Sequence, residues 1–464
     1  MGFGLFKKKA SADLVLVNGN VRTMDPDMPL AEAVACASGR IIGVGSRADI
    51  ESLITAQTQI VDLEGRTVTP GWIEPHSDPI PELFKDQYLP LSDPMTQEAM
   101  LGAILAYIER HPEEERYLAY GYGPGTISEE DLPLIRRELD RTSPDKPVVL
   151  VASDGLHMIL NTWAASAMAR EAEELDLPAV TPGLVSSALL SADIGSLLRN
   201  YSMHAFALAQ RGITGEFVLP SFAHFENIHR ELLVDIYQAN LLKQRYFGSL
   251  LLNTPLPERI VLHHMAQKNT ACAELKGLIQ FNTLYVRFSG TERSSRHMSP
   301  SYLRQLCTLA ADKGYHIRMA ALDHPAALTA LTLLSELKTS YRRSSFSAEH
   351  DEEISEEERS AILTAEVHEY SLAHGGKQAV SSREALENHT VRSADQLGIS
   401  GDAGTLEVGK WADLAVFEQD PWNEGERPPS AWMTILNGSI VFDRRRDTRE
   451  NWTRDFMWSA FSEN

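Results

Sequence analysis

The stretch TVTPGWIEPHSDPI, residues 67–80, contains the features that decide the expected fold and site. It has a short β-branched strand, a Pro-Gly break and a second apolar piece that ends in a His-Ser-Asp triplet. On an extended backbone, side chains two residues apart point to the same side. His76 and Asp78 are therefore placed to face one metal ion together. The stretch alone leaves three interpretations open: a metal site, the remains of one, or a loop that contains a histidine.

Both ends of the chain are rich in predicted strands. Residues 12–70 consist of short apolar runs separated by turns, with an Asn-Gly pair at 18–19. Residues 403–443 follow the same pattern, with a second Asn-Gly pair at 437–438. Asn-Gly between alternating apolar residues is the strongest short-range indication of a β-hairpin. We therefore predict hairpins at both pairs and one β-sandwich assembled from the two ends of the chain.

The middle of the chain, residues 71–395, alternates apolar runs with segments of helical periodicity. A buried strand is expected at 146–153, and a helix followed by a strand at 201–219. The segment 299–314 begins with Ser299 as N-cap and a proline in the first turn, as helices often do. Repeated strand–helix alternation predicts a parallel α/β barrel or a doubly wound sheet.

Three domains follow from these patterns. We expect residues 1–70 to form the N-terminal half of the sandwich, and residues 71–395 to form the α/β barrel or doubly wound sheet. Residues 396–464 form the C-terminal half of the sandwich and a tail helix. A length of 464 residues suggests either more than one domain or one large barrel with an accessory unit.

The composition limits the expected partners. With 43 Lys and Arg against 64 Asp and Glu, the formal net charge is −21. Such an acidic surface repels phosphate backbones and anionic lipid headgroups, so we expect neither nucleic acid nor a membrane as partner. Three widely spaced cysteines without a Cys-x-x-Cys pair are typical of reduced thiols in a cytoplasmic protein. A homo-oligomer stays open, because the aromatic tail at 451–461 suits packing on a second copy as well as on its own barrel.

Several segments resemble one known superfamily: ADLVLVNGNVRTMDPD, SGRIIGVGS, TVTPGWIEPH, and AGTLEVGKWADLAVFEQDP with ILNGSIVFD. The chain resembles the amidohydrolase superfamily, in particular amidohydrolase family 3, whose branch includes N-substituted formamide deformylase-like proteins. The resemblance implies a TIM-type (β/α)8 barrel with a β-sandwich built from both termini. It also implies metal-assisted hydrolysis, in which divalent ions activate a bound water and polarise the scissile carbonyl at the carboxyl ends of the strands.

The family pattern places His-x-His after the first strand, then a carboxylated Lys or its equivalent, two further His and a final Asp. His76 matches the first position, and Asp78 stands where the second His belongs. His350, in FSAEHDE, matches the family's Glu-His near the seventh strand. Because carboxylates also ligate zinc and manganese, the resemblance implies a mononuclear site of His76, Asp78 and His350 for one of these ions.

Other family positions are replaced in this sequence. Tyr285 and Ser289 stand where relatives have Lys and Asp, and Ala320 occupies an expected His position. In VVLVASDGLH, the third position of the family's Asp-Gly-His is Leu156, and His157 follows one residue later. A shift of one residue turns a side chain to the other face of a strand.

The family's catalytic Asp on the eighth strand has no counterpart between His350 and Glu384. This leaves open whether the barrel is incomplete at its last strand. Asp154 or Glu216 would then have to replace the missing base. His157, close to Asp154, is a further acid–base candidate.

Two functions from different classes follow. The first is a metal-dependent hydrolase that acts on carbon–nitrogen bonds other than peptide bonds, with a small-molecule amide as substrate. The second is a catalytically inactive barrel that binds a small molecule or serves as an oligomer partner, because several ligand positions are replaced. A nucleic-acid deaminase is not expected, since the chain lacks His-x-Glu with Pro-Cys-x-x-Cys.

Overall fold

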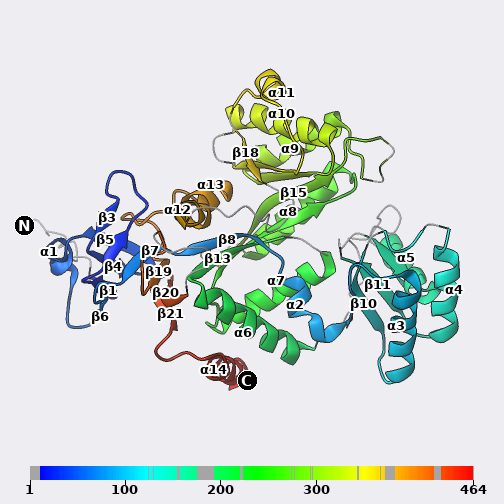
Figure 1. Cartoon of the computed structure of the whole chain (residues 1–464), viewed down its shortest axis with the longest axis horizontal. Helices are drawn as coiled ribbons and strands as arrows, with labels where there is room; N and C mark the ends of the chain where they lie inside the picture. The colour runs from blue at the N-terminus through cyan, green and yellow to red at the C-terminus, as the bar shows by residue number, and fades with distance from the viewer. Residues whose placement is uncertain are drawn as a thin grey trace, which may run out of the picture. The chain divides into compact units, whose positions relative to one another are not determined.

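The structure is a computed structural model, shown in Figure 1. It describes residues 11–123, 125–128, 130–153, 157–174, 193–219, 223–272, 274–275, 277–292, 294, 296–341, 344–365, 367–370, 382–422 and 430–462. The chain forms two compact units, each considered by itself. Unit 1 comprises Met1–Ser77, Ala205–Leu219 and Leu241–Trp452, and unit 2 comprises Asp78–His204, Pro220–Asn240 and Thr453–Asn464.

The central sheet of unit 1 has seven strands in the order β18-β17-β16-β15-β14-β13-β8, and every neighbouring pair is parallel. The strands are β8 (Trp72–Ser77), β13 (Ile213–Val218), β14 (Arg245–Leu252), β15 (Ile279–Phe288), β16 (His316–Ala321), β17 (Phe346–Glu349) and β18 (His368–Tyr370). The sheet curls into an open half-barrel (Figure 1). The predicted parallel sheet is therefore present, whereas its closure into an eight-stranded ring stays a prediction.

Helices cover the outer face of this sheet. They are α8 (Glu258–Cys272), α9 (Pro300–Asp312), α10 (His324–Ser340) and the short α11 (Glu356–Ile362), and they share one buried apolar cluster with β15, β16 and β17. Helix α9 begins as predicted, because Ser299 caps it by accepting the Tyr302 N–H at 3.3 Å and Pro300 is its first residue.

Strands from the two ends of the chain form two further sheets in unit 1. The four-stranded sheet has the order β5-β4-β1-β6 and the six-stranded sheet the order β21-β20-β19-β7-β2-β3. Their strands are β1 (Leu14–Val17), β2 (Asn20–Arg22), β3 (Leu30–Ala31), β4 (Ala33–Ala37), β5 (Arg40–Gly45), β6 (Gln59–Asp62), β7 (Thr67–Pro70), β19 (Leu414–Phe417), β20 (Ala431–Leu436) and β21 (Ser439–Asp443); α1 (Arg47–Ile50) and the 3-10 turn η1 (Glu51–Leu53) follow β5. Leu16 and Val34 of one sheet share a buried cluster with Val68 and Leu414 of the other. The six-stranded sheet thus joins the two ends of the chain.

One of the two predicted Asn-Gly hairpins is wrong. The pair at 437–438 does join the antiparallel strands β20 and β21. The pair at 18–19 joins β1 and β2, which lie in different sheets: β1 pairs with β4 and β6, and β2 pairs with β3 and β7. A Cβ on Gly19 would lie 2.2 Å from Leu63 Cδ1, so this tight crossing between sheets explains the glycine without a hairpin.

Apart from Thr453–Asn464, unit 2 falls inside the range 71–395 that the sequence assigns to the barrel. Its sheet has the order β12-β11-β10-β9, formed by β9 (Leu89–Pro90), β10 (Tyr117–Tyr122), β11 (Val148–Ala152) and β12 (Met158–Leu160). Its helices are α2 (Ile80–Leu83), the 3-10 turn η2 (Lys85–Gln87), α3 (Gln97–Arg110), α4 (Leu132–Thr142), α5 (Thr162–Glu174) and α7 (Ala223–Gln238), while α6 (Ile194–Gln210) and α14 (Arg449–Ser462) contain residues of both units. The strand predicted at 146–153 is β11 of this sheet. None of the helices in the described part of the chain has the length and apolar character needed to cross a membrane.

The outer edge of β8 is covered by a helical segment instead of a strand. This segment runs through α12 (Ser382–Glu387), the π-helical turn η4 (Asn388–Arg392) and α13 (Ser393–Gln396). The imidazole of His389 stacks on Trp72 at 5.3 Å, and its Nδ1 hydrogen-bonds the Ile73 carbonyl at 3.1 Å. Pro75, two residues on, has no N–H to offer a further strand, which is typical of an edge strand.

The pH dependence of stability is predicted from His316 at the start of β16. This side chain is buried, and its Nδ1 accepts the Ser345 N–H at 2.9 Å. Burial lowers the pKa of His316 from 6.5 to about 4. The unfolded chain therefore binds more protons between these values, and the free energy of unfolding falls as the pH drops from about 6.5 to about 4, by on the order of 3 kcal/mol.

The variant His316→Asn keeps an acceptor near Nδ1 and removes this titration. Urea unfolding at pH 7 and pH 4.5 should give a smaller loss of stability for the variant than for the wild type. Equal losses in the two proteins would contradict the assignment.

Candidate functional site

The inner face of the half-barrel carries a row of polar side chains that runs from the middle of β15 and β16 to the carboxyl end of β17. Tyr285 of β15 is in register with Arg318 of β16, which is in register with Ser347 of β17. Glu349 lies two residues after Ser347 and therefore points to the same face. Intervening residues such as Met319 belong to the apolar cluster under the outer helices. Alternation along the strands thus separates an apolar outer face from a polar inner row.

Arg318 is the centre of this row and is only 2% exposed. Its Nε donates a hydrogen bond to Glu349, and its Nη1 donates to the Pro75 carbonyl at 3.1 Å. Its Nη2 lies 3.0 Å from Nδ1 and 2.9 Å from Nε2 of His76. The guanidinium carbon is 4.6 Å from the ring centroid of Phe217, which adds a cation–π contact. One side chain therefore connects the ends of β8, β13 and β17.

Glu349 balances the charge of Arg318 and is fully buried. Its second carboxylate oxygen accepts the hydroxyl of Tyr285 at 2.6 Å. Burial opposes ionisation, yet the Arg318 guanidinium and these hydrogen bonds hold the pKa of Glu349 below its usual range. Burial and then the charge of Glu349 raise the pKa of Tyr285 well above its ordinary value. At neutral pH the row is a guanidinium, a carboxylate and a neutral phenol.

His76 is half-buried at the end of β8. A guanidinium is a hydrogen-bond donor only, so the ring nitrogen that accepts from Arg318 must carry a lone pair. An imidazole with a lone pair on one nitrogen is also the form that accepts a proton from water.

His350, the third predicted metal ligand, has different partners. Its Nε2 lies 2.9 Å from Glu369 and its Nδ1 lies 3.1 Å from the Glu352 carbonyl. Glu369 is in register with Ala348, which belongs to the outer apolar cluster, whereas Glu349 faces the inner row. Both partners of His350 are acceptors, so each contact needs an N–H on the ring, and a ring nitrogen that donates is not a metal ligand.

The ion pair with His350 also affects its acidic partner. Burial opposes ionisation of Glu369, but the hydrogen bonds from His350 and Arg359 lower the pKa of Glu369 to about 2. The Glu369 carboxylate is therefore ionised at neutral pH.

Three predicted residues belong to unit 2 or lie outside the described residues. Asp78 is exposed and is the first residue of unit 2. His157 is exposed in unit 2, where its carbonyl accepts the Ala152 N–H at 2.8 Å between β11 and β12. Asp154 lies outside the described residues. Their roles stay predictions.

Glu216, the other candidate base, is fully buried on β13. It accepts a hydrogen bond from Ser77 at 2.6 Å. Its neighbour Phe217 lies against Arg318, and successive residues of a strand point to opposite faces. Glu216 is therefore directed to the face of the sheet opposite the inner row.

The described donors do not fit a divalent metal ion as they stand. Among the residues that the structure describes, no three His, Cys, Asp or Glu side chains lie close enough together to hold one ion. The Arg318 guanidinium lies within hydrogen-bond distance of His76 and carries a positive charge of the kind that a metal would supply. The metal roles of His76, Asp78 and His350 thus stay predictions.

Sequence reasoning missed Arg318 and Tyr285 as members of the site. One feature of the sequence could have identified Arg318: it is an arginine inside the apolar strand sequence HIRMAA. A charged residue is almost never fully buried unless it is paired, so a buried arginine there predicts a charged partner nearby. Its partners could not be read from the sequence, because they lie on other strands.

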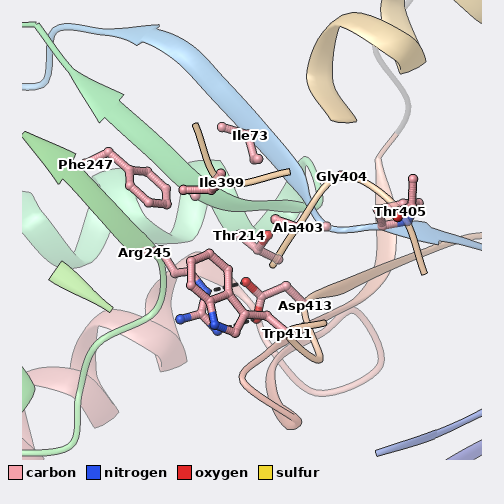
Figure 2. A pocket seen from close by; sticks show the side chains of 13 residues that line it. Ile73, Thr214, Arg245, Phe247, Ile399, Ala403, Gly404, Thr405, Trp411 and Asp413 are labelled. Atoms are coloured by element: carbon pink, nitrogen blue, oxygen red, sulfur yellow. Dashed lines mark hydrogen bonds and ion pairs between the residues drawn. The ribbon is translucent and has the colours of Figure 1, made fainter. Parts of the chain in front are cut away.

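A second polar cluster lies at the opposite, amino-terminal ends of the strands (Figure 2). Arg245, at the start of β14, binds Asp413 through two hydrogen bonds of 2.5 and 3.0 Å and stacks on Trp411 at 3.9 Å. The space that they line with Gly71 and Thr214 is about 10 Å³, room for about one water molecule. This end of the sheet is therefore a packed closure rather than a substrate site.

Comparisons with known proteins agree with this architecture. A family model described as "Amidohydrolase family" matches residues 59–186 and 371–442. The exoenzymes regulatory protein AepA of Pectobacterium carotovorum subsp. carotovorum is 30% identical over 185 residues, which cover 39% of each chain. The N-substituted formamide deformylase of Arthrobacter pascens is 32% identical over 143 residues, 30% of this chain and 26% of that protein. The chain thus matches less than half the length of these curated relatives.

Solved structures show the same fold at low sequence identity. An uncharacterized metal-dependent hydrolase from Pyrococcus horikoshii OT3 has a TM-score of 0.54 at 14% identity, with 89% of this chain and 99% of that chain covered. Atrazine chlorohydrolase TrzN from Arthrobacter aurescens TC1, complexed with zinc, has a TM-score of 0.51 at 14% identity, with 96% and 100% covered. The family model and the N-substituted formamide deformylase support membership of the amidohydrolase superfamily, which the sequence resembles, and the solved structures share its fold.

Proposed function

We propose that this protein is a hydrolase that acts on carbon–nitrogen bonds other than peptide bonds, with a small-molecule amide as substrate and His76 as the proton-transfer residue. The supporting observation is the buried pair of Arg318 and Glu349 beside His76. Glu349 and His76 stand at the carboxyl ends of parallel strands, where barrels of this type build active sites. Burying an ion pair is a weak way to stabilise a fold, so such a row favours a functional role. The relative named as a formamide deformylase supports the substrate class.

The proposed hydrolysis uses two side chains of this protein, His76 and Arg318. The ring nitrogen of His76 that carries the lone pair exchanges its hydrogen bond from Arg318 for one from water, and takes a proton from that water as the water oxygen bonds to the carbonyl carbon. When the carbon–nitrogen bond breaks, His76 passes that proton to the leaving nitrogen. Arg318 orients the ring, and its charge stabilises the negative charge that develops on the carbonyl oxygen. A divalent ion would supply bound hydroxide and polarise the carbonyl, but the described donors do not fit one, so no step is assigned to it.

The test is hydrolysis of a panel of N-substituted formamides and other small amides by the purified full chain. We expect product formation above the uncatalysed rate, and a fall of kcat/KM by about 10²-fold or more in His76→Gln, because general acid–base catalysis contributes about 10²–10⁴-fold. His263→Gln, at an exposed position on α8, is the matched control and should leave kcat/KM unchanged. No hydrolysis of any amide, or equal rates for wild type and His76→Gln, would contradict the proposal.

A second candidate is an inactive barrel that binds a small amide without hydrolysing it. It is favoured because the polar groups of the row already have partners within the protein. Arg318 lies against both ring nitrogens of His76, and both oxygens of Glu349 accept hydrogen bonds. Calorimetric binding of an amide without product formation would support this candidate over the hydrolase. A cytoplasmic location and a homo-oligomer stay proposals for either function.

A further inference from the structure

We infer that Arg318 is the resident cation of this site: its guanidinium holds the position beside His76 and Glu349 that a divalent ion would need, and the folded protein binds no zinc or manganese there. The inference deepens the proposed function, because hydrolysis would then proceed without a metal. It can be tested without any substrate.

Charge is the first argument. Arg318 and Glu349 are 3% and 0% exposed in their side chains, so the pair is withdrawn from water. A guanidinium keeps its proton at any pH that a protein tolerates, so the positive charge is permanent. A metal bound to His76 would lie within a few ångströms of this charge, where the low dielectric makes repulsion strong.

Geometry is the second argument. The planar guanidinium reaches the Pro75 carbonyl and His76 at the end of β8 and Glu349 at the end of β17. The guanidinium carbon lies over the ring of Phe217, 4.6 Å from its centroid, and this contact helps to hold the guanidinium in place. Arg318 therefore links strand ends much as a metal ion shared by several ligands would, and the rim does not need an ion to hold its shape.

The replaced family position is the third argument. Ala320 stands where relatives are expected to carry a His, and it is in register with Glu349. It lies two residues after Arg318, so both point to the inner face. A methyl group offers no metal donor, and its small size leaves room for the guanidinium to extend toward the carboxyl end of β16. The loss of a ligand and the gain of a cation thus occur on the same face of one strand.

The first test is metal content of the wild type. The full chain is purified without chelator, incubated with excess zinc or manganese, desalted and analysed for metal by mass spectrometry. We expect far less than one ion per chain, and a thermal midpoint unchanged by added zinc or by chelator. One ion per chain that His76→Ala removes would overturn the inference.

The second test uses Arg318→Met, which removes the charge and keeps an unbranched side chain of moderate length. This variant leaves His76 and Glu349 without their cation, so we expect a lower thermal midpoint that zinc raises. The response to zinc should disappear in Arg318→Met/His76→Ala. Arg304→Met, at an exposed pair with Glu336, is the control and should show no response to zinc. A zinc response of the wild type equal to that of Arg318→Met would overturn the inference.

The experiments can contradict the resident-cation inference and the hydrolase function separately. If Arg318→Met does not fold, the metal content of the wild type still decides the resident-cation inference. A wild type that hydrolyses amides and holds one zinc at His76 overturns the resident-cation inference and keeps the hydrolase. A wild type without bound metal that hydrolyses no amide supports the resident cation and overturns the hydrolase.

Discussion

Replacing Arg245 by methionine is expected to lower the free energy of unfolding by about 3–5 kcal/mol, because it leaves the carboxylate of Asp413 buried without its partner. The pair is bidentate, with hydrogen bonds of 2.5 and 3.0 Å, and the side chains are 2% and 9% exposed. Arg245 also stacks on Trp411 (Figure 2), so packing is lost along with charge. Urea unfolding followed by circular dichroism measures the change.

Two further variants separate charge from packing at this position. Arg304→Met removes an arginine from an exposed ion pair and should cost less than about 1 kcal/mol. The double variant Arg245→Met/Asp413→Leu removes both charges and should recover much of the loss, because an apolar pair can replace a buried ion pair. A cost for Arg245→Met as small as that of Arg304→Met would contradict the assignment of this cluster as a packed closure.

The variant Glu349→Gln is expected to have an effect of similar size, about 3–5 kcal/mol, because it leaves Arg318 as an uncompensated buried cation. Its pH dependence follows from the lowered pKa of Glu349. A carboxyl group whose pKa is lower in the folded state contributes its full stabilisation above its unfolded value, near 4.5, and loses it as the pH falls further. The difference between wild type and variant should be constant from pH 7 to about 5 and shrink below about 4.5.

The matched control for this variant is Tyr285→Phe. It removes one hydrogen bond to the carboxylate and keeps the Arg318 pair, so it should cost less, about 1.5–3 kcal/mol. Unfolding free energies at pH 7, 5 and 3.5 test both variants. A gap between wild type and Glu349→Gln that widens as the pH falls would contradict the ionised state of Glu349.

Local patterns in the sequence predict much of the fold. Strand–helix alternation predicts the parallel sheet, and Ser299 with Pro300 predicts the start of α9. These features depend on side chains a few residues apart, so a single stretch contains them. The pair at 18–19 shows where local patterns fail, since a chain that crosses between two sheets uses the same turn residues as a hairpin.

The site was less predictable, because its contacts depend on strand register. His76 is placed at a strand end as expected, but its partner is Arg318, more than two hundred residues later. His350 follows Glu349 directly, and the face that each side chain takes decides which of them meets Arg318. A match to the family's Glu-His identifies both positions without telling which of the two lies in the inner row.

Diffraction data collected at the zinc absorption edge, from crystals of the wild type grown with zinc, test most directly whether Arg318 takes the place of a metal. The account predicts the Arg318 guanidinium within hydrogen-bond distance of His76 and no anomalous peak at that ring. An anomalous peak bonded to His76, with Arg318 displaced from Glu349, would contradict it.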